Sequence, residues 1–230
     1  MNIYGLQKMT LLDFPGHVAC TVFLGGCDFR CPFCHNYALA CGEESVVMSD
    51  EELLAFLDKR TGLLDGVAIT GGEPCLYQEL PGLLARIKEK GFMTKLDTNG
   101  YHPALLQKIL EEGLADYVAM DIKNSPGKYA LTAGVDSIDM GRIRESIALI
   151  MQKAPDYEFR TTVVREFHEP EDFEQIGRLI SGAGKYFLQP FTDRDSVPFG
   201  DLHAPSKEEL SEYAARAAAF VQDIQIRGLD

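Results

Sequence analysis

The decisive stretch of this sequence is Cys27-Asp28-Phe29-Arg30-Cys31-Pro32-Phe33-Cys34, in which three residues and then two separate successive cysteines. It follows a short apolar run, His17 to Leu24, and the pair Gly25-Gly26. Three thiolates this close together can hold one compact metal centre. A cubane iron–sulfur cluster is saturated by four cysteine ligands, so three would leave one iron with an open coordination position. Open positions are typical of metals that do chemistry, whereas structural metal sites are closed.

Length and composition indicate one globular domain. The chain has 230 residues, of which 46% are hydrophobic, and a chain of this size buries roughly 70–75% of its unfolded surface without disulfide support. No apolar stretch reaches the roughly 18 residues that a membrane-spanning helix needs. The first residues, Met1 to Gly5, lack the basic and apolar segments of a secretory signal. We therefore expect a cytoplasmic protein that has no membrane partner.

Charge and cysteine usage narrow the function classes. The formal net charge is −13 at pH 7, and a chain this acidic repels phosphate backbones, so we expect no nucleic-acid partner. The six cysteines do not indicate a disulfide framework, because the chain is large and shows no export signal. In a reducing compartment, clustered cysteines bind metal or react.

A short apolar or β-branched run, a turn and an amphipathic helix pattern recur along the chain. The predicted strands are His17–Leu24, Gly66–Thr70, Met93–Thr98, Asp116–Asp121, Tyr157–Val164 and Lys185–Gln189, and the predicted helices are Ser49–Arg60, Gln78–Lys90, Pro103–Glu112, Asp139–Lys153, Glu169–Ser181 and Ser206–Gln225. Ser49 and Ser206, each followed by acidic residues, are the expected N-caps of the first and last helices.

Six strand–helix units predict a parallel sheet, and a complete barrel of this kind has eight. We therefore expect an α/β fold, an incomplete TIM-like (βα)6 barrel. It would form a single domain over residues 1–230, with a cysteine-bearing loop at residues 25–36, hereafter the cluster loop, and a C-terminal helix at about 206–225.

Polar or glycine-rich groups follow each of the first four predicted strands. They are the cluster loop, Gly71-Gly72-Glu73-Pro74, Asp97-Thr98-Asn99-Gly100 and Asp121-Ile122-Lys123. Parallel α/β sheets bind their ligands at the carboxyl ends of the strands. We therefore expect these four segments to meet at one rim of the barrel and to form the functional site.

The cysteine spacing followed by Gly-Gly-Glu-Pro resembles the radical S-adenosylmethionine (SAM) superfamily. More closely, the chain is similar to the activating enzymes of glycyl-radical enzymes, and among them to the activase of anaerobic ribonucleoside-triphosphate reductase. The closer similarity is carried by Thr10-Leu11-Leu12-Asp13-Phe14-Pro15-Gly16, Phe23-Leu24-Gly25-Gly26-Cys27, Cys31-Pro32-Phe33-Cys34-His35-Asn36, Asp97-Thr98-Asn99-Gly100 and Asp121-Ile122-Lys123. It runs from about residue 3 to about residue 190 and implies the radical SAM fold.

The resemblance also implies cofactors and the residues that would hold them. Cys27, Cys31 and Cys34 would ligate three irons of one [4Fe–4S] cluster, and the fourth iron would bind the amino and carboxylate groups of SAM. Further contacts to SAM would come from Phe33, His35, Gly71, Gly72, Glu73, Asn99, Lys123 and Arg160. In some relatives a monovalent cation binds beside SAM, and the matching oxygens here belong to Asp97, Thr98, Asp121 and the carbonyl of Ala119.

The implied reaction is a reductive cleavage of SAM under anaerobic conditions. It would yield methionine and a 5′-deoxyadenosyl radical, which takes a hydrogen atom from the α-carbon of a glycine in a larger protein. The implied partners are a glycyl-radical enzyme, with anaerobic ribonucleotide reductase as the first choice, and flavodoxin or ferredoxin as the electron donor. One departure concerns the last strand. Several activases carry a histidine soon after a Pro-aromatic pair, whereas here Thr192 follows Pro190-Phe191.

Two other functions fit parts of the sequence. A radical SAM enzyme acting on a small molecule, such as a deazapurine-forming synthase, would use the same cofactors. A non-catalytic module could instead bind zinc through the three cysteines and either His35 or Cys41. Plainer roles also remain open for two candidates, a salt bridge for Arg160 and a solvated surface position for Lys123. His17, His102, His168 and His203 are expected at turns or on the surface, without a task.

Overall fold

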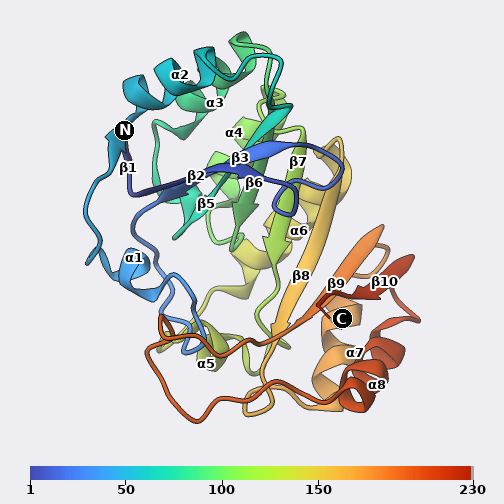
Figure 1. Ribbon diagram of the computed structural model, residues 1–230. Helices are drawn as coiled ribbons and strands as arrows, with labels where there is room; N and C mark the ends of the chain where they lie inside the picture. The colour runs from blue at the N-terminus through green and yellow to red at the C-terminus, as the bar shows by residue number, and fades with distance from the viewer. Residues whose placement is uncertain (229–230) are drawn as a thin grey trace.

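The main sheet of the protein is mostly parallel and is not closed into a full barrel (Figure 1). A computed structural model describes residues 1–228, and the expected domain range, 1–230, extends beyond them. Within the described residues the order of strands is β10-β9-β8-β7-β6-β5-β3-β2, and only β2 and β3 pair antiparallel. These strands are β2 (Gly5–Thr10), β3 (Ala19–Leu24), β5 (Gly66–Gly71), β6 (Met93–Thr98), β7 (Tyr117–Asp121), β8 (Tyr157–Val163), β9 (Lys185–Pro190) and β10 (Asp223–Ile226).

Helices connect the parallel strands and lie outside the curved sheet (Figure 1). The longer ones are α2 (Asp50–Asp58), α3 (Leu80–Glu89), α4 (Pro103–Glu111), α6 (Met140–Lys153), α7 (Pro170–Leu179) and α8 (Lys207–Ala217). Short elements are the helices α1 (Tyr37–Cys41) and α5 (Tyr129–Ala133), the 3-10 turn η1 (Pro74–Leu76), and an antiparallel pair formed by β1 (Asn2–Ile3) and β4 (Met48–Ser49). No helix in residues 1–228 combines the length and apolar character needed to cross a membrane.

The predicted helix starts at Ser49 and Ser206 are confirmed. The hydroxyl of Ser49 accepts a hydrogen bond from the Glu52 amide, and that of Ser206 accepts one from the Glu209 amide. Each glutamate side chain in turn accepts a hydrogen bond from the backbone of its serine. Both starts are therefore capping boxes, which satisfy N–H groups that the first helical turn leaves unpaired.

The six predicted strand–helix units are present, so the α/β fold is confirmed, but the end of the chain was predicted wrongly. The C-terminal helix stops at Ala217 rather than near residue 225, and Asp223–Ile226 forms β10, parallel to β9. Along β10 the side chains alternate, with Ile224 and Ile226 half-buried and their neighbours exposed. This two-residue period is typical of a strand with one covered face.

Charged side chains lie inside the sheet's curve. Lys95 on β6 and Glu158 on β8 are 2% and 1% exposed, and buried charges need partners. Glu158 receives hydrogen bonds from both terminal nitrogens of Arg227 at 2.6 and 2.7 Å and from the Tyr117 hydroxyl at 2.7 Å. Side chains alternate along a strand, so Asp97 and Arg160 project on the same face as these residues and continue the paired charges toward the carboxyl ends of the strands.

Candidate active site

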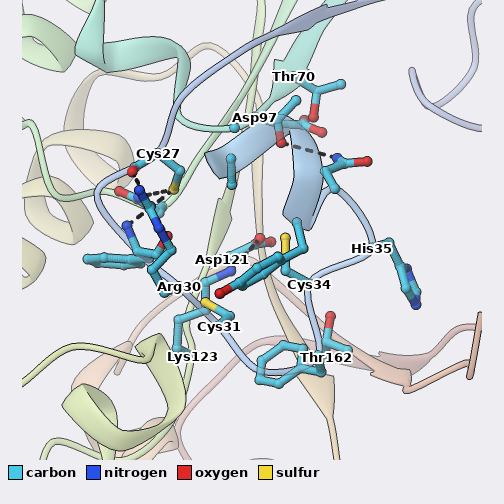
Figure 2. Close-up of a pocket in the computed structure, with 18 of the residues that line it drawn as sticks. Cys27, Arg30, Cys31, Cys34, His35, Thr70, Asp97, Asp121, Lys123 and Thr162 are labelled. Carbon is cyan, nitrogen blue, oxygen red and sulfur yellow. Dashed lines mark hydrogen bonds and ion pairs between the residues drawn. The ribbon is translucent and has the colours of Figure 1, made fainter. Parts of the chain in front are cut away.

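One cavity of about 210 Å³ lies between the cluster loop and the carboxyl ends of the strands. All four polar segments that were expected to share a rim contribute to it. The cluster loop and α1 supply Cys27, Phe29, Arg30, Cys31, Phe33, Cys34, His35, Asn36, Tyr37 and Ala40, and the strand ends supply Thr70, Gly71, Gly72, Asp97, Thr98, Asn99, Asp121, Lys123, Arg160 and Thr162. Figure 2 shows Cys31, Cys34, Asp121 and Lys123 gathered near its centre.

The three cysteines of the loop all line this cavity. Cys27 Sγ accepts a hydrogen bond from the Phe29 amide at 3.4 Å, and Cys31 Sγ lies 3.7 Å from the carbonyl of Ala133. Burial raises the pKa of the Cys27 thiol to about 12 and that of Cys31 to about 11, with the charge of Lys123 opposing the second shift. Burial also raises the pKa of Cys34. As free thiols they keep their protons at neutral pH, so binding a metal centre would release protons.

This donor set fits an iron–sulfur cluster better than a single metal ion. Within residues 1–228, no three side chains of His, Cys, Asp or Glu are close enough together to hold one ion. A zinc site needs four ligands around one point, whereas each thiolate of a cubane binds its own iron. The zinc alternative therefore lacks a set of ligands around one point. His35, one of its candidate ligands, is hydrogen-bonded to the carbonyl of Thr192.

Two carboxylates and two cations form a chain of ion pairs on the strand side of the cavity. Arg160 Nε lies 2.8 Å from Asp121 Oδ1 and Arg160 Nη1 lies 3.4 Å from Asp97 Oδ2. Lys123 Nζ lies 3.0 Å from Asp121 Oδ2. Burial alone would raise the pKa of Asp121, but the charges of Arg160 and Lys123 outweigh it and hold that pKa well below its ordinary range.

The same pairs keep the two cations charged. Burial alone would lower the pKa of Lys123 and of Arg160, yet the nearby carboxylates raise both above their ordinary values. The Lys123 side chain is only 15% exposed, so Lys123 is not a solvated surface lysine. Arg160 makes the salt bridges that were its alternative role, and it also lines the cavity. A structural salt bridge and a contact to SAM are therefore compatible roles for this side chain.

Glu73 lies behind the cavity wall and is absent from its lining. Its side chain is completely buried and accepts hydrogen bonds from the Cys75 amide at 2.8 Å, the Thr98 hydroxyl at 2.8 Å and the Asn99 amide at 2.6 Å. Burial raises the pKa of this carboxyl, and these bonds work against the shift. In this structure Glu73 holds the Thr98-Asn99 turn, while Gly71 and Gly72 reach the cavity.

The two glycines are required by the backbone of β3 and of the cluster loop, which packs against them. The Gly72 amide donates to the Leu24 carbonyl at 2.8 Å. A Cβ on Gly72 would lie 1.9 Å from the Gly26 oxygen, and one on Gly71 would lie 2.3 Å from the Leu24 oxygen. Gly71 also has φ of +114°, a conformation that only glycine adopts without strain. Close backbone packing therefore requires glycine at both positions, independently of the approach to SAM that the resemblance implied.

Asn99 links a strand end to the cluster loop. Its side-chain nitrogen lies 3.0 Å from Asp28 Oδ1 and 3.8 Å from Cys27 Sγ. The other oxygen of Asp28 pairs with His102 Nε2 at 3.0 Å, and this hydrogen bond raises the pKa of His102. No task was predicted for His102, although it follows the candidate site residue Asn99 by only three positions.

Phe33 and His35 occupy different parts of the cavity wall. Phe33 is buried, and its ring centroid lies 6.1 Å from that of Phe167. His35 Nε2 donates to the Thr192 carbonyl at 2.7 Å, and its ring stacks on Phe191 at 6.0 Å between centroids. The imidazole of His35, from the cluster loop, thus lies next to Thr192. In several activases a histidine near this point comes from the segment after the Pro-aromatic pair instead.

The expected site for a monovalent cation does not fit one. Each carboxylate oxygen of Asp97 and Asp121 already faces a nitrogen of a lysine or arginine. The Thr98 hydroxyl donates to Glu73 and accepts from the Gly100 amide at 3.0 Å. Ala119 lies between β6 and β8, paired with Asp97 and Glu158, and is not part of the cavity lining. We therefore correct this expectation: protein cations occupy the surroundings of these oxygens.

Two buried residues near the site were missed from the sequence. Lys95 pairs with Asp97; its place two residues before Asp97 on a predicted strand was the available signal. His168, expected at the surface, is 2% exposed. Its Nε2 lies 2.9 Å from the carbonyl of Lys123, and its Nδ1 accepts from the Val164 amide at 3.2 Å. His168 thereby fixes the backbone that carries Lys123.

Comparison with known proteins identifies the family. The model of the Radical SAM superfamily matches residues 21–180. The chain belongs to the radical SAM superfamily. Membership of this superfamily implies a [4Fe–4S] cluster and SAM as cofactors, which agrees with three thiols and paired charges around one cavity.

Three curated relatives show the range of related functions. A Methanocaldococcus jannaschii protein, whose assignment as a glycyl-radical enzyme activating enzyme is itself provisional, is 31% identical over 99% of this chain and 96% of its own. The pyruvate formate-lyase-activating enzyme of Clostridium pasteurianum is 37% identical over 54% of this chain and 52% of its own. The 7-carboxy-7-deazaguanine synthase of Methanocaldococcus jannaschii is 26% identical over 88% of this chain and 85% of its own.

A solved radical SAM structure shares the fold. Streptococcus suis SuiB bound to S-adenosylmethionine superposes with a TM-score of 0.63 at 15% identity. The match covers 90% of this chain and 52% of the SuiB chain. This chain therefore corresponds to about half of SuiB, and the likeness concerns the fold alone.

Proposed function

We propose that this protein is a radical SAM activase that cleaves SAM reductively and generates a glycyl radical on a partner enzyme, anaerobic ribonucleoside-triphosphate reductase. The observation that carries the proposal is the cavity that Cys27, Cys31 and Cys34 line together with Lys123 and Arg160. The similarity to a glycyl-radical enzyme activating enzyme over 99% of the chain supports the class of partner.

Different residues of the cavity bind each of the two cofactors. Cys27, Cys31 and Cys34 hold the [4Fe–4S] cluster, which when bound supplies the electron that splits SAM into methionine and a 5′-deoxyadenosyl radical. Lys123 and Arg160 present positive charge to the SAM carboxylate, since both remain charged when buried. The remaining contacts to SAM come from Phe33, His35, Asn99 and the backbone of Gly71 and Gly72.

The partner contributes the glycine that loses a hydrogen atom. Transfer of this atom to the 5′-deoxyadenosyl radical yields 5′-deoxyadenosine and leaves the unpaired electron on the glycine α-carbon. A glycine loop bends tightly enough to enter such a site, and the sheet, with β2 and β10 at its ends, is not closed around the cavity. Flavodoxin or ferredoxin delivers the electron in an anaerobic cytoplasm.

The test is an electron paramagnetic resonance assay on the partner. Anaerobically reconstituted protein should contain about four irons per chain and cleave SAM under reductant. Incubation with anaerobic ribonucleotide reductase should produce a doublet signal on that enzyme. Cys31→Ala should abolish SAM cleavage and the doublet, whereas Cys20→Ala, at a fully buried position outside the cavity, should keep both. SAM cleavage without a doublet on any glycyl-radical enzyme would reject the activase assignment.

A small-molecule radical SAM function is the second candidate, favoured by the similarity to 7-carboxy-7-deazaguanine synthase over 88% of the chain. It uses the same cofactors and differs in what receives the radical. If this candidate is right, reactions supplied with the substrate of 7-carboxy-7-deazaguanine synthase should yield a carboxy-deazaguanine product that mass spectrometry detects. Absence of that product together with a doublet on a partner protein would exclude it.

A further inference from the structure

Lys95 is a lysine whose charge is buried beside the active site. It lies in the middle of β6, its side chain is 2% exposed, and its only ion-pair partner among residues 1–228 is Asp97. Two residues apart on one strand, Lys95 and Asp97 project on the same face. The Lys95 ammonium also lies 5.9 Å from the centroid of the Tyr117 ring, at a distance where a ring face attracts a cation.

Asp97 is held by cations on both of its oxygens. Its Oδ1 pairs with Lys95 Nζ, and its Oδ2 lies 3.4 Å from Arg160 Nη1. Burial alone would raise the pKa of Asp97, but the charges of Arg160 and Lys95 outweigh it and keep this pKa below its ordinary value. Asp97 lines the cavity, so Lys95 neutralises a carboxylate that is exposed to the SAM-binding space.

Removing the ammonium would leave the carboxylate with one cation instead of two. A buried carboxylate that loses a charged partner becomes costly, and a small cation from solution could then take the vacant place beside it. The Lys95 ammonium carries the same charge as Na⁺, K⁺ or NH₄⁺ but is covalently attached, so no ion needs to be captured from solution.

We infer that Lys95 is a positioning residue whose ammonium neutralises the Asp97 carboxylate in place of a bound monovalent cation. SAM binding here is therefore independent of Na⁺ and K⁺. The inference rests on the proposed binding of SAM in this cavity. It does not depend on which molecule receives the radical, so failure of the glycyl-radical assay and failure of the cation test are separate results.

The experiment compares reconstituted wild type with Lys95→Met, which removes the charge at nearly constant length, and with Lys95→Ala, which leaves room for an ion. SAM dissociation constants and melting temperatures without SAM are measured anaerobically in chlorides of Na⁺, K⁺, NH₄⁺ or choline at equal ionic strength. Lys88→Met is the matched control, because Lys88 pairs with Asp116 at 2.5 Å outside the cavity. The double variant Lys95→Met/Asp97→Asn removes both charges of the pair.

Wild type should give the same SAM affinity, within about twofold, in every salt. In choline chloride Lys95→Met should bind SAM about tenfold more weakly, the factor that corresponds to losing about one charged hydrogen bond. A saturable addition of K⁺ or NH₄⁺ should restore most of this loss and raise the melting temperature. Lys95→Ala should show the same rescue, while the double variant and Lys88→Met should show none.

Four results would overturn the inference. They are a wild type that needs Na⁺ or K⁺ for SAM binding, a Lys95→Met variant that binds SAM as wild type does in choline, a loss in that variant that no cation restores, and an equal rescue of Lys88→Met. If Lys95→Met folds only in K⁺ or NH₄⁺ buffer, the inference is supported. If it folds in no buffer, the salt dependence of wild type and of Lys95→Ala decides.

Discussion

Replacing Glu73 by glutamine separates a positioning role for this residue from direct contact with SAM. Glu73 Oε1 accepts from the Cys75 amide and the Thr98 hydroxyl, and Oε2 accepts from the Asn99 amide. A glutamine oxygen placed at Oε1 keeps the first two bonds. Its NH₂ group then meets the Asn99 N–H, donor against donor, so a buried amide loses its partner.

The expected cost follows from that one unsatisfied amide. Leaving a buried donor unpaired costs about 1–3 kcal/mol. For a chain of this size each kcal/mol lowers the melting temperature by about 2–4 °C, so a mid-range loss of about 2 kcal/mol lowers it by about 4–8 °C. SAM binding should weaken less than about tenfold, which is 1.4 kcal/mol, because Glu73 acts on the site only through the Thr98-Asn99 turn.

The assay pairs calorimetry of the reconstituted protein with SAM binding, and Glu79→Gln at an exposed position is the control. The control should leave both quantities unchanged. The reasoning fails if Glu73→Gln melts like wild type but loses SAM affinity by about a hundredfold. That result would mean that the carboxylate contacts SAM itself.

Three further substitutions test the packing against the cluster loop, an open helix position as its control, and the protonation of a buried histidine. Gly134→Ala should lower the iron bound on reconstitution, because its Cβ would lie 2.0 Å from the Arg30 oxygen at φ of +67°. Gly82→Ala, in α3 with open space around it, should retain iron and stabilise the helix by up to about 1 kcal/mol. Burial lowers the pKa of His168, so as pH falls below about 6.5 the unfolded chain takes up the proton first and stability declines. His168→Gln should flatten that decline in urea titrations between about pH 5 and pH 8; an unchanged slope would contradict a neutral buried imidazole.

Local signals in the sequence carried the prediction of the fold and of the rim. Each of the first four predicted strands is followed by glycine or polar residues that strand interiors disfavour, such as Gly71-Gly72 or Asp121. The ends of these strands, and the residues grouped there, could therefore be predicted from the sequence. The C-terminal helix was extended too far because the alanine-rich pattern of α8 runs smoothly toward residue 220, and the strand that follows is short.

What the sequence could not supply was the pairing of buried polar groups. His168 is buried because its two ring nitrogens meet the backbone of Val164 and of Lys123, which is 45 residues away along the chain. A cation site among Asp97, Thr98, Ala119 and Asp121 was plausible as long as their oxygens were counted alone. In the structure Lys95, Arg160 and Lys123 already pair with these carboxylates, so their oxygens are not available to a bound cation.

The cluster loop and the Gly-Gly-Glu-Pro segment behave as one structural unit, although 36 residues separate Cys34 from Gly71. The Glu73 amide donates to the Gly26 carbonyl at 2.8 Å, and the Asn36 side chain donates to the Gly71 carbonyl at 3.1 Å. Backbones this close exclude side chains at the contact, so a change in either motif displaces the other. Gly72→Ala should therefore disturb the cysteines even though residue 72 is not a proposed ligand of iron, and loss of iron from that variant would distinguish a shared scaffold from a contact made only to SAM.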